Sequence, residues 1–237
     1  MQQVKYLDLG LKDYKEAWEL QENFLKENVQ LKTEARQNDE HYDPKKLQTK
    51  QYLIFCEHPP VYTLGKSGSM ENVLITSDEM KHKGISFFNT NRGGDITFHG
   101  PEQVVGYPIF DLEKSYTDIG KYLRNLEQVI IDTLAELGIN SGRSAGETGV
   151  WLDAGIKGKE RKICAMGVRC SRWITMHGFA LNVNTDLHYF NYIIPCGIVN
   201  KQVTSIEKEL GKKVEMEKVK ALLRDNFEKI FEIELVY

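Results

Sequence analysis

Residues 92–103 read RGGDITFHGPEQ, and Tyr107 follows four positions later. The paired glycines Gly93 and Gly94 permit backbone geometry that other residues avoid, and they let a ligand approach the main chain closely. The side chains that would surround such a ligand with donors are Arg92, Thr97, His99 and Gln103. An ordinary turn with polar side chains explains any one of them alone. The whole cluster, packed into twelve residues between two expected strands, favours a binding site.

Short apolar runs interrupted by Gly, Pro or Asn lie on both sides of this stretch and are typical of strands. The expected strands before the middle of the chain are Tyr52–Glu57, Val61–Leu64, Ile85–Asn89, Ile96–His99 and Val104–Leu112. Those after it are Gly149–Asp153, Lys162–Arg169 and Trp173–Val183, connected by hairpin-like turns.

Three helices are expected from apolar residues spaced three and four apart. One begins near Asp13, one covers Asp118–Leu137 with Gly138 in the C-cap position, and one covers Glu215–Phe231. The elements do not alternate strictly as β-α-β. The sequence therefore predicts an α+β fold, one domain over residues 1–237, with a mixed, largely antiparallel sheet and flanking helices.

The polar stretch Lys32–Lys50 contains few apolar residues and is expected to be an exposed loop, an insertion or a solvated helix extension. A second polar region, Gly142–Arg172, carries seven basic and three acidic residues. Its positive charge would steer acidic partners, unless it is simply a solvated hairpin.

Composition excludes several classes of protein. The net charge of −3 argues against a nucleic-acid binder. The N-terminus has no secretory pattern and no run reaches 18 apolar residues, so a cytoplasmic protein without a membrane span is expected. The four cysteines (Cys56, Cys164, Cys170 and Cys196) show no C-x-x-C pair and are expected to be thiols.

Phosphate and metal sites are not expected. Gly65-Lys66-Ser67 resembles the end of a P-loop, but Pro60 stands where the first glycine belongs. Cys56 and His58 alternate along an expected strand, and no second Cys/His pair has ligand spacing.

Two further stretches place reactive residue types in defined contexts. In RKICAMG, residues 161–167, strand alternation puts Lys162 and Cys164 on one face, although a lysine at a strand start is usually solvated. In IPCG, residues 194–197, Cys196 lies between Pro and Gly. A turn is expected there, which makes Cys196 the most exposed thiol of the four.

In order along the chain, RGGDITFHGPEQ with Tyr107, GETGVW, RKICAMGVR, HGFALNVN and IPCG resemble the lipoyl(octanoyl) transferases, also called the lipoate-protein ligase B family. The resemblance runs from Glu57 to Glu207. It implies the biotin/lipoate-protein ligase catalytic fold. Glu102 departs from it, because the family usually has glycine before Gln103.

The resemblance also implies an activity. Family members move an octanoyl group from octanoyl-acyl carrier protein to one lysine of a lipoyl domain, in 2-oxoacid dehydrogenase E2 subunits or the glycine cleavage H protein, without a cofactor or ATP. The acyl-thioester cysteine matches Cys196, and the lysine that lowers its pKa matches Lys162. The matching substrate-binding residues are Arg92, Gly93, Gly94, Asp95, Ile96, Thr97, Phe98, His99, Ala165, Met166, Gly167, Gly178, Phe179 and Ala180.

Three alternatives remain at this point. An ATP-dependent lipoate ligase on the same fold would not need Cys196. An inactive module that only binds lipoyl domains would never carry the acyl group. A Cys–His thiol hydrolase would use His99 or His177 as base and release free acid.

Overall fold

The computed structural model describes residues 2–39, 41–194 and 202–237. Its strands are β1 (Gln2–Leu11), β2 (Tyr52–Glu57), β3 (Val61–Leu64), β4 (Ser86–Asn89), β5 (Ile96–His99), β6 (Gln103–Ile109), β7 (Val150–Leu152), β8 (Arg161–Ser171), β9 (Ile174–Asn182), β10 (Gln202–Val203) and β11 (Ile233–Val236). Its α-helices are α1 (Tyr14–Asn38), α2 (Ser77–His82), α3 (Ile119–Glu136), α4 (Ile206–Leu210) and α5 (Met216–Phe231). Short 3-10 helices lie at η1 (Met70–Asn72), η2 (Leu112–Lys114) and η3 (Leu187–Tyr192).

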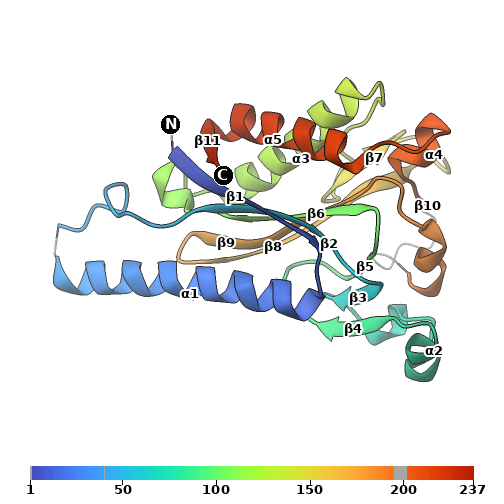
Figure 1. Ribbon diagram of the computed structural model, residues 1–237, viewed down its shortest axis with the longest axis horizontal. Coiled ribbons are helices and arrows are strands. Elements are labelled where there is room, and N and C mark those ends of the chain that lie inside the picture. The colour runs from blue at the N-terminus through green and yellow to red at the C-terminus, as the bar shows by residue number, and fades with distance from the viewer. Residues whose placement is uncertain (1, 40, 195–201) are drawn as a thin grey trace.

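A large sheet forms the centre of the molecule, with helices on both faces (Figure 1). Its strand order is β10-β8-β9-β6-β2-β1-β11, and β7 pairs with β8. The pairs among β2, β6, β9, β8 and β7 are antiparallel, whereas β1 is parallel to both β2 and β11. Helices α3 and α5 cover one face and α1 covers the other (Figure 1).

Strand β2 shows why the centre of this sheet is apolar on both faces. Leu53 and Phe55 pack into the core beneath α3 and α5. Ile54 and Cys56 alternate with them and pack into the core beneath α1. The uninterrupted apolar run of this strand follows from burial on two sides.

A smaller sheet of order β4-β3-β5 lies at one end of the large sheet, next to α2 (Figure 1). Its own core contains Tyr62, Ile96 and Phe98, together with Phe190 from η3. This arrangement brings the stretch RGGDITFHGPEQ, which leads from the small sheet into β6, beside β8 and β9.

The fold class predicted from the sequence is confirmed, and most elements lie within a residue or two of their expected bounds. The parallel strands β1 and β11 were not predicted. The alternation of Val4 and Tyr6 with Gln3 and Lys5 is the signal that would have indicated β1. Strand β11 has only four residues, and its partner is more than 200 positions away.

The expectation for the stretch Lys32–Lys50 was partly wrong. Helix α1 continues to Asn38, so an extension exists, but its buried face passes through Asn28 and Lys32. The side chain of Lys32 is fully buried and bonds Asp111, Glu113 Oε2 at 2.8 Å and the carbonyl oxygen of Arg172 at 3.0 Å. Acceptors brought from distant segments make this burial possible, and local sequence does not reveal them.

Across the described residues, no helix combines the length and apolar character that a membrane crossing requires.

Candidate active site

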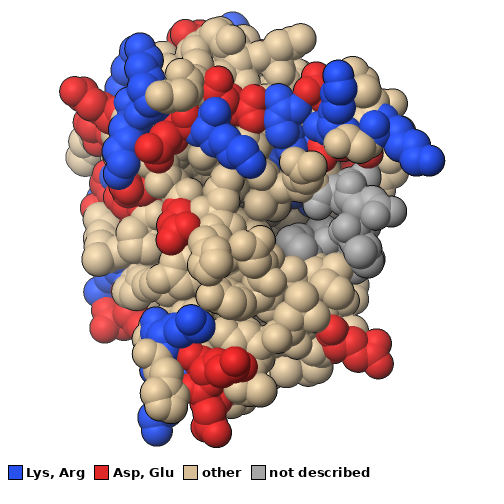
Figure 2. All heavy atoms as spheres, turned by 90° about the vertical axis from the view of Figure 1, so that its right-hand side faces the viewer, with Lys and Arg blue, Asp and Glu red and all other residues tan. Residues whose placement is uncertain are grey.

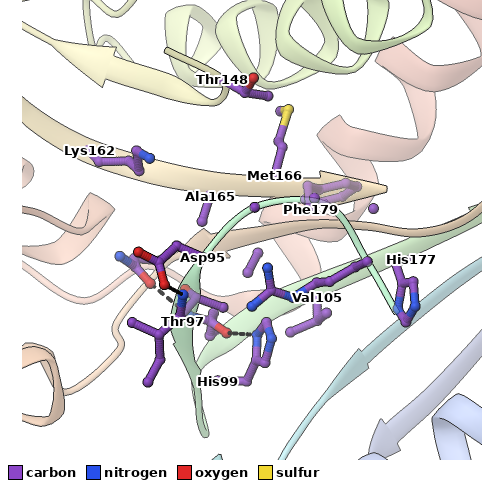
Figure 3. A pocket seen from close by; sticks show the side chains of 18 of the residues that line it. Asp95, Thr97, His99, Val105, Thr148, Lys162, Ala165, Met166, His177 and Phe179 are labelled. Carbon is purple, nitrogen blue, oxygen red and sulfur yellow. Dashed lines mark hydrogen bonds between the residues drawn. The ribbon is translucent and has the colours of Figure 1, made fainter. Parts of the chain in front are cut away.

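A cavity of about 360 Å³ opens where the two sheets meet. Figure 3 shows Lys162 and Ala165 on one strand of its wall, with Thr97 and His99 on another strand below them. Of the predicted site residues, those that line the cavity are Arg92, Gly94, Asp95, Ile96, Thr97, His99, Lys162, Ala165, Met166, Gly167, Gly178, Phe179 and Ala180. Motifs that are up to 88 positions apart in the sequence thus meet at one cavity, and their role in substrate binding stays a prediction.

Two predicted residues lie behind this wall. Phe98 stacks on Tyr189 in the core of the small sheet, with ring centroids 4.6 Å apart. The amide of Gly93 donates to the carbonyl oxygen of Val168 at 2.9 Å, which ties the loop before β5 to β8. A Cβ on Gly167 would lie 2.5 Å from the Gly93 oxygen, so this glycine serves the close approach of two backbones.

Lys162 reaches the cavity because β8 contains a bulge. Trp151 pairs with Lys162 and Val150 with Cys164, which leaves Ile163 as an extra residue on β8. Ile163 and Cys164 both pack in the core beneath α3 and α5, whereas Lys162 lines the cavity. The expectation that Lys162 and Cys164 share a face is therefore wrong. The solvated alternative for Lys162 is also wrong, because the residue is only 8% exposed.

A chain of buried hydrogen bonds fixes the state of His99. Gln103 Nε2 donates to the carbonyl oxygen of Phe98, so its Oε1 is the atom that faces His99 Nδ1 at 3.0 Å. His99 Nδ1 must then carry the proton, and Nε2 accepts from the hydroxyl of Thr63 at 3.3 Å. Arg92 donates to the same hydroxyl oxygen at 2.9 Å. Burial, His58 and the Arg92 charge hold the pKa of His99 well below its usual value.

The chain continues from Gln103 toward Lys162. Gln103 Nε2 also donates to Asn182 Oδ1 at 2.9 Å, and Asn182 Nδ2 donates to the carbonyl oxygen of Thr204 at 2.9 Å. The amide of Thr204 donates to the carbonyl oxygen of Lys162 at 2.9 Å. In each of these bonds the donor lies on the Gln103 side and the acceptor on the Lys162 side. One network therefore links the motifs RGGDITFHGPEQ and RKICAMG.

His177 is held by a separate network and lies in the left-handed region with φ +57°. Its amide donates to Gln21 Oε1 at 2.9 Å, and its ring Nε2 donates to Asn91 Oδ1 at 2.7 Å. The Asn91 amide orientation follows from its donation to Glu22 at 2.8 Å. Burial and the charges of Arg92 and Arg169 lower the pKa of His177 to about 3. At neutral pH both cavity histidines are uncharged. The one lone pair of His99, on Nε2, is engaged by the Thr63 hydroxyl, so His99 is not free to act as a base.

The described cysteines are unsuited to nucleophilic chemistry. Cys56 and Cys164 are fully buried, and burial raises the pKa of each thiol well above its ordinary value. Cys170 is half-buried, and burial raises the pKa of its thiol too. A thiolate is the reactive form, so these three sites disfavour it. The predicted nucleophile Cys196 lies outside the described residues.

Gln103, expected from the sequence as a donor near the ligand, also lines the cavity. Several cavity residues were not among the predicted site residues: Tyr14, Ser67, Val105, Tyr107, Gly146, Glu147, Thr148, His177, Asn182, Phe190 and Val203. Tyr107, Gly146–Thr148, His177 and Asn182 belong to motifs already quoted, so motif membership was the signal that would have found them. Tyr14, at the start of α1, has no such signal, because only the packing of α1 against the sheet brings it to the cavity.

Comparison with known proteins identifies the family. Residues 13–228 match the model of the lipoyl protein ligase A/B catalytic domain. The chain belongs to this family. The sequence motifs predicted the lipoyl(octanoyl) transferases, and this expectation is confirmed.

Two relatives in the lipoyl protein ligase A/B family are similar over nearly their full length. An octanoyltransferase of Christiangramia forsetii is 56% identical, over 99% of this chain and 98% of the relative. An octanoyltransferase of Flavobacterium johnsoniae is also 56% identical, over 98% of each chain. A solved bi-partite lipoate protein ligase of Thermoplasma acidophilum aligns with a TM-score of 0.68 over all of this chain and 86% of its own. At 17% identity, that structure supports the fold alone.

Proposed function

We propose that this protein transfers an octanoyl group from octanoyl-acyl carrier protein to a specific lysine of lipoyl domains, through a thioester on Cys196. The protein is an acyltransferase that acts in protein lipoylation, since relatives that are 56% identical over nearly the whole chain are octanoyltransferases. The acceptors would be the lipoyl domains of 2-oxoacid dehydrogenase E2 subunits and the glycine cleavage H protein. Because acyl carrier protein is the donor, we place the reaction in the cytoplasm.

The observation that carries the route through Cys196 is the position of Lys162. This lysine lines a cavity whose opposite side contains the Arg92 loop and whose β9 wall offers Phe179 and Ala180 to an acyl chain. Strand β10, which follows the Cys196 segment, pairs with β8 at Lys162, where Val203 is its direct partner. Phe190 and Val203, one on each side of the segment in sequence, both line the same cavity.

The chemistry proceeds in two balanced steps. The Cys196 thiolate attacks the carbonyl carbon of the donor thioester, the bond from that carbon to the carrier sulfur breaks, and the departing sulfur takes a proton from Lys162. The acceptor amine then attacks the Cys196 thioester. Its C–N bond forms as the C–S bond breaks, and its proton passes to Lys162. A nearby ammonium favours the Cys196 thiolate in the first step, and a neutral amine is the base in the second.

Charge near the cavity supports docking of acidic carriers. Figure 2 shows Lys and Arg side chains, mixed with acidic ones, along the edge that contains α4, the start of α5 and the β7–β8 hairpin. Three of the arginines counted in the sequence serve the fold, since Arg143 pairs with Glu127, Arg161 with Glu209 and Arg169 with Glu22. The exposed lysines of this edge are Lys157, Lys159, Lys208, Lys212, Lys213 and Lys218, and Lys213 pairs with Glu102. These exposed lysines would attract an acidic domain over about one Debye length.

The experiment is intact-mass analysis of the protein after incubation with octanoyl-acyl carrier protein in the absence of ATP. We expect a gain of one octanoyl mass that hydroxylamine removes, and transfer to a lipoyl domain on its addition. Cys196→Ala should gain no mass and transfer nothing. Cys170→Ser, which changes the half-buried thiol, is the matched control and should label as the wild type does.

Labelling that persists in Cys196→Ala with transfer intact would overturn the assignment. A requirement for ATP would favour the ligase alternative, and release of free octanoate without acceptor would favour the hydrolase.

A further inference from the structure

The two reaction steps use no residue of the GETGVW motif, residues 146–151. Its last residue, Trp151, nevertheless contacts the proposed catalytic lysine. Trp151 on β7 is the direct cross-strand partner of Lys162 on β8. The Lys162 Nζ lies 4.5 Å from the centroid of the Trp151 ring. Both residues are buried, so water weakens this contact little.

Gly149 leaves room for this contact. Its φ of +113° lies in the region that favours glycine. A Cβ at this position would stand 2.5 Å from the Cys164 carbonyl oxygen and 3.7 Å from Lys162 Cε. A side chain here would therefore displace the β8 backbone that carries Lys162, although it would meet the lysine stem itself only at ordinary van der Waals distance.

Glu127 on α3 anchors the same motif. Its carboxylate is fully buried and accepts the amide of Gly149 at 3.0 Å, the Arg124 guanidinium at 2.6 Å and the Arg143 guanidinium at 2.9 Å. The backbone of Trp151 is fixed as well, through two 2.8 Å hydrogen bonds with Gly142. The indole ring is therefore presented to Lys162 from a rigid frame.

We infer that Trp151 is a positioning residue for Lys162, and that its ring face holds the lysine as an ammonium ion at the cavity wall. The inference rests on the proposed function. It adds a role for the GETGVW motif in that reaction. The negative face of an indole attracts a cation, so the ring favours the charged lysine over the neutral one. The ammonium in turn favours the thiolate of the proposed nucleophile.

Other charged groups act on the same lysine. Glu127 lies behind the motif with its charge shared between Arg124 and Arg143. Glu147 belongs to the motif and lines the cavity. Arg161, next to Lys162 on β8, is engaged by Glu209 and Asp153. The test therefore keeps all of these groups and changes only the ring.

The test compares Trp151→Phe, which keeps an aromatic face, with Trp151→Leu, which removes it. Phe110→Leu is the control, because it removes a buried ring from the far side of the core, beside Phe227 and Phe231. The first readout is the rate of Cys196 alkylation by iodoacetamide as a function of pH, followed by mass spectrometry. The second is kcat and KM for octanoyl transfer.

We expect Trp151→Leu to slow alkylation at pH 7 by about tenfold and to move the profile to higher pH, while Trp151→Phe stays within about threefold. The loss should appear in kcat and not in KM, because the ring does not line the cavity. Phe110→Leu should keep the wild-type profile. A profile unmoved in Trp151→Leu would overturn the inference, as would equal losses in the two Trp151 variants.

Fluorinated tryptophans placed site-specifically at position 151 keep the test decisive if Trp151→Leu does not fold. They keep the shape of the ring and weaken its negative face, so the alkylation rate should fall with each added fluorine. A constant rate across the series would refute the inference. Failure of the proposed function is a separate result, since wild-type protein would then not label at Cys196 at all.

Discussion

Two regions of this molecule bury a lysine, and they do so in opposite ways. In the Lys32 cluster (Lys32, Arg36, Asp111 and Glu113), the ammonium donates to two carboxylates and to a backbone carbonyl oxygen. At the cavity, Lys162 lies over the ring of Trp151 and reaches the space where a substrate would bind. The first lysine directs its three N–H bonds at fixed acceptors of the fold, so its ammonium group is fully engaged by the structure.

The partners of each lysine distinguish burial that serves the fold from burial that serves the site. Asp111 Oδ2 also accepts from Thr49 at 2.8 Å, so the Lys32 cluster joins α1, the loop after it and the end of β6. Its charges neutralise one another. The cavity wall instead combines a cation, neutral imidazole rings and hydrogen bonds aligned in one direction. Substitutions in the Lys32 cluster should lower the unfolding free energy, and substitutions at the cavity wall should lower the rate of octanoyl transfer.

The largest effect is expected from exchanging the two lysines for methionine. Lys162→Met should lower octanoyl transfer by about 100-fold or more, because proton transfer by a positioned side chain contributes at least that much. Its unfolding free energy should change little. Lys162→Arg should lower octanoyl transfer as well, since arginine keeps the charge and cannot act as a base.

Lys32→Met leaves two buried carboxylates without their cation and should cost about 3–5 kcal/mol of unfolding free energy. Its transfer rate per folded molecule should match the wild type. Urea unfolding and transfer assays on both variants provide the comparison. If Lys32→Met lost activity while folded and Lys162→Met lost only stability, the assignment of the two regions would be reversed.

A second test measures how the unfolding free energy changes as the pH is lowered. Burial lowers the pKa of His58 to about 4 and that of His177 to about 3, and it lowers that of His99 as well. These rings are neutral in the folded state and take up protons near pH 6.5 in the unfolded state. Their stabilising contribution is therefore complete above pH 6.5 and declines as the pH falls toward the folded values.

Between pH 7.5 and 5.5 we expect each of these three rings to remove about 1 kcal/mol of unfolding free energy. The carboxylates whose pKa is lowered, Glu79 and Glu209, titrate below this window. His58→Gln should reduce the pH dependence by about a third, whereas His41→Gln, at an exposed position, should leave it unchanged. Equal stability at both pH values would show that the rings are not held neutral.

The smallest effect is expected at Glu102, which departs from the family at the edge of the cavity wall. Its φ is +57°, so glycine suits the position. The residue is held there because its amide donates to Glu57 at 2.7 Å and its carboxylate pairs with Lys213 at 2.8 Å. The left-handed backbone at this position gives a physical reason for the glycine that the family resemblance leads us to expect.

Glu102→Gly should relieve strain of about 1 kcal/mol and lose a surface ion pair worth less than that. We therefore expect a small rise in melting temperature and unchanged transfer. Lys213→Met should lose a few tenths of a kcal/mol alone and nothing further in the Glu102→Gly background. A large destabilisation of Glu102→Gly would mean that its carboxylate has a structural role beyond this pair.

The three long helices α1, α3 and α5 and most strands followed from sequence because their signals are local, whereas the short helices α2 and α4 were not predicted. Asp118 caps α3, and Gly138 adopts the positive φ of a helix C-terminus, both within a few residues of the apolar periodicity. The turn between β8 and β9 has two consecutive positive-φ residues, Arg172 and Trp173, which suits a tight hairpin. Strands β1 and β11 were missed because parallel pairing joins the two ends of the chain, a contact that no local pattern encodes.

The fold class, the family and the set of site motifs could be read from the sequence, because motif order and apolar period are properties of the chain alone. The three-dimensional packing was needed to show how Lys162 reaches the cavity and that Lys32 is buried among carboxylates. A single extra residue at Ile163 separates Lys162 from Cys164, and acceptors more than 70 positions away make the burial of Lys32 possible. Which side chains share a space depends on register and on long-range partners, and both exist only once the sheet has formed.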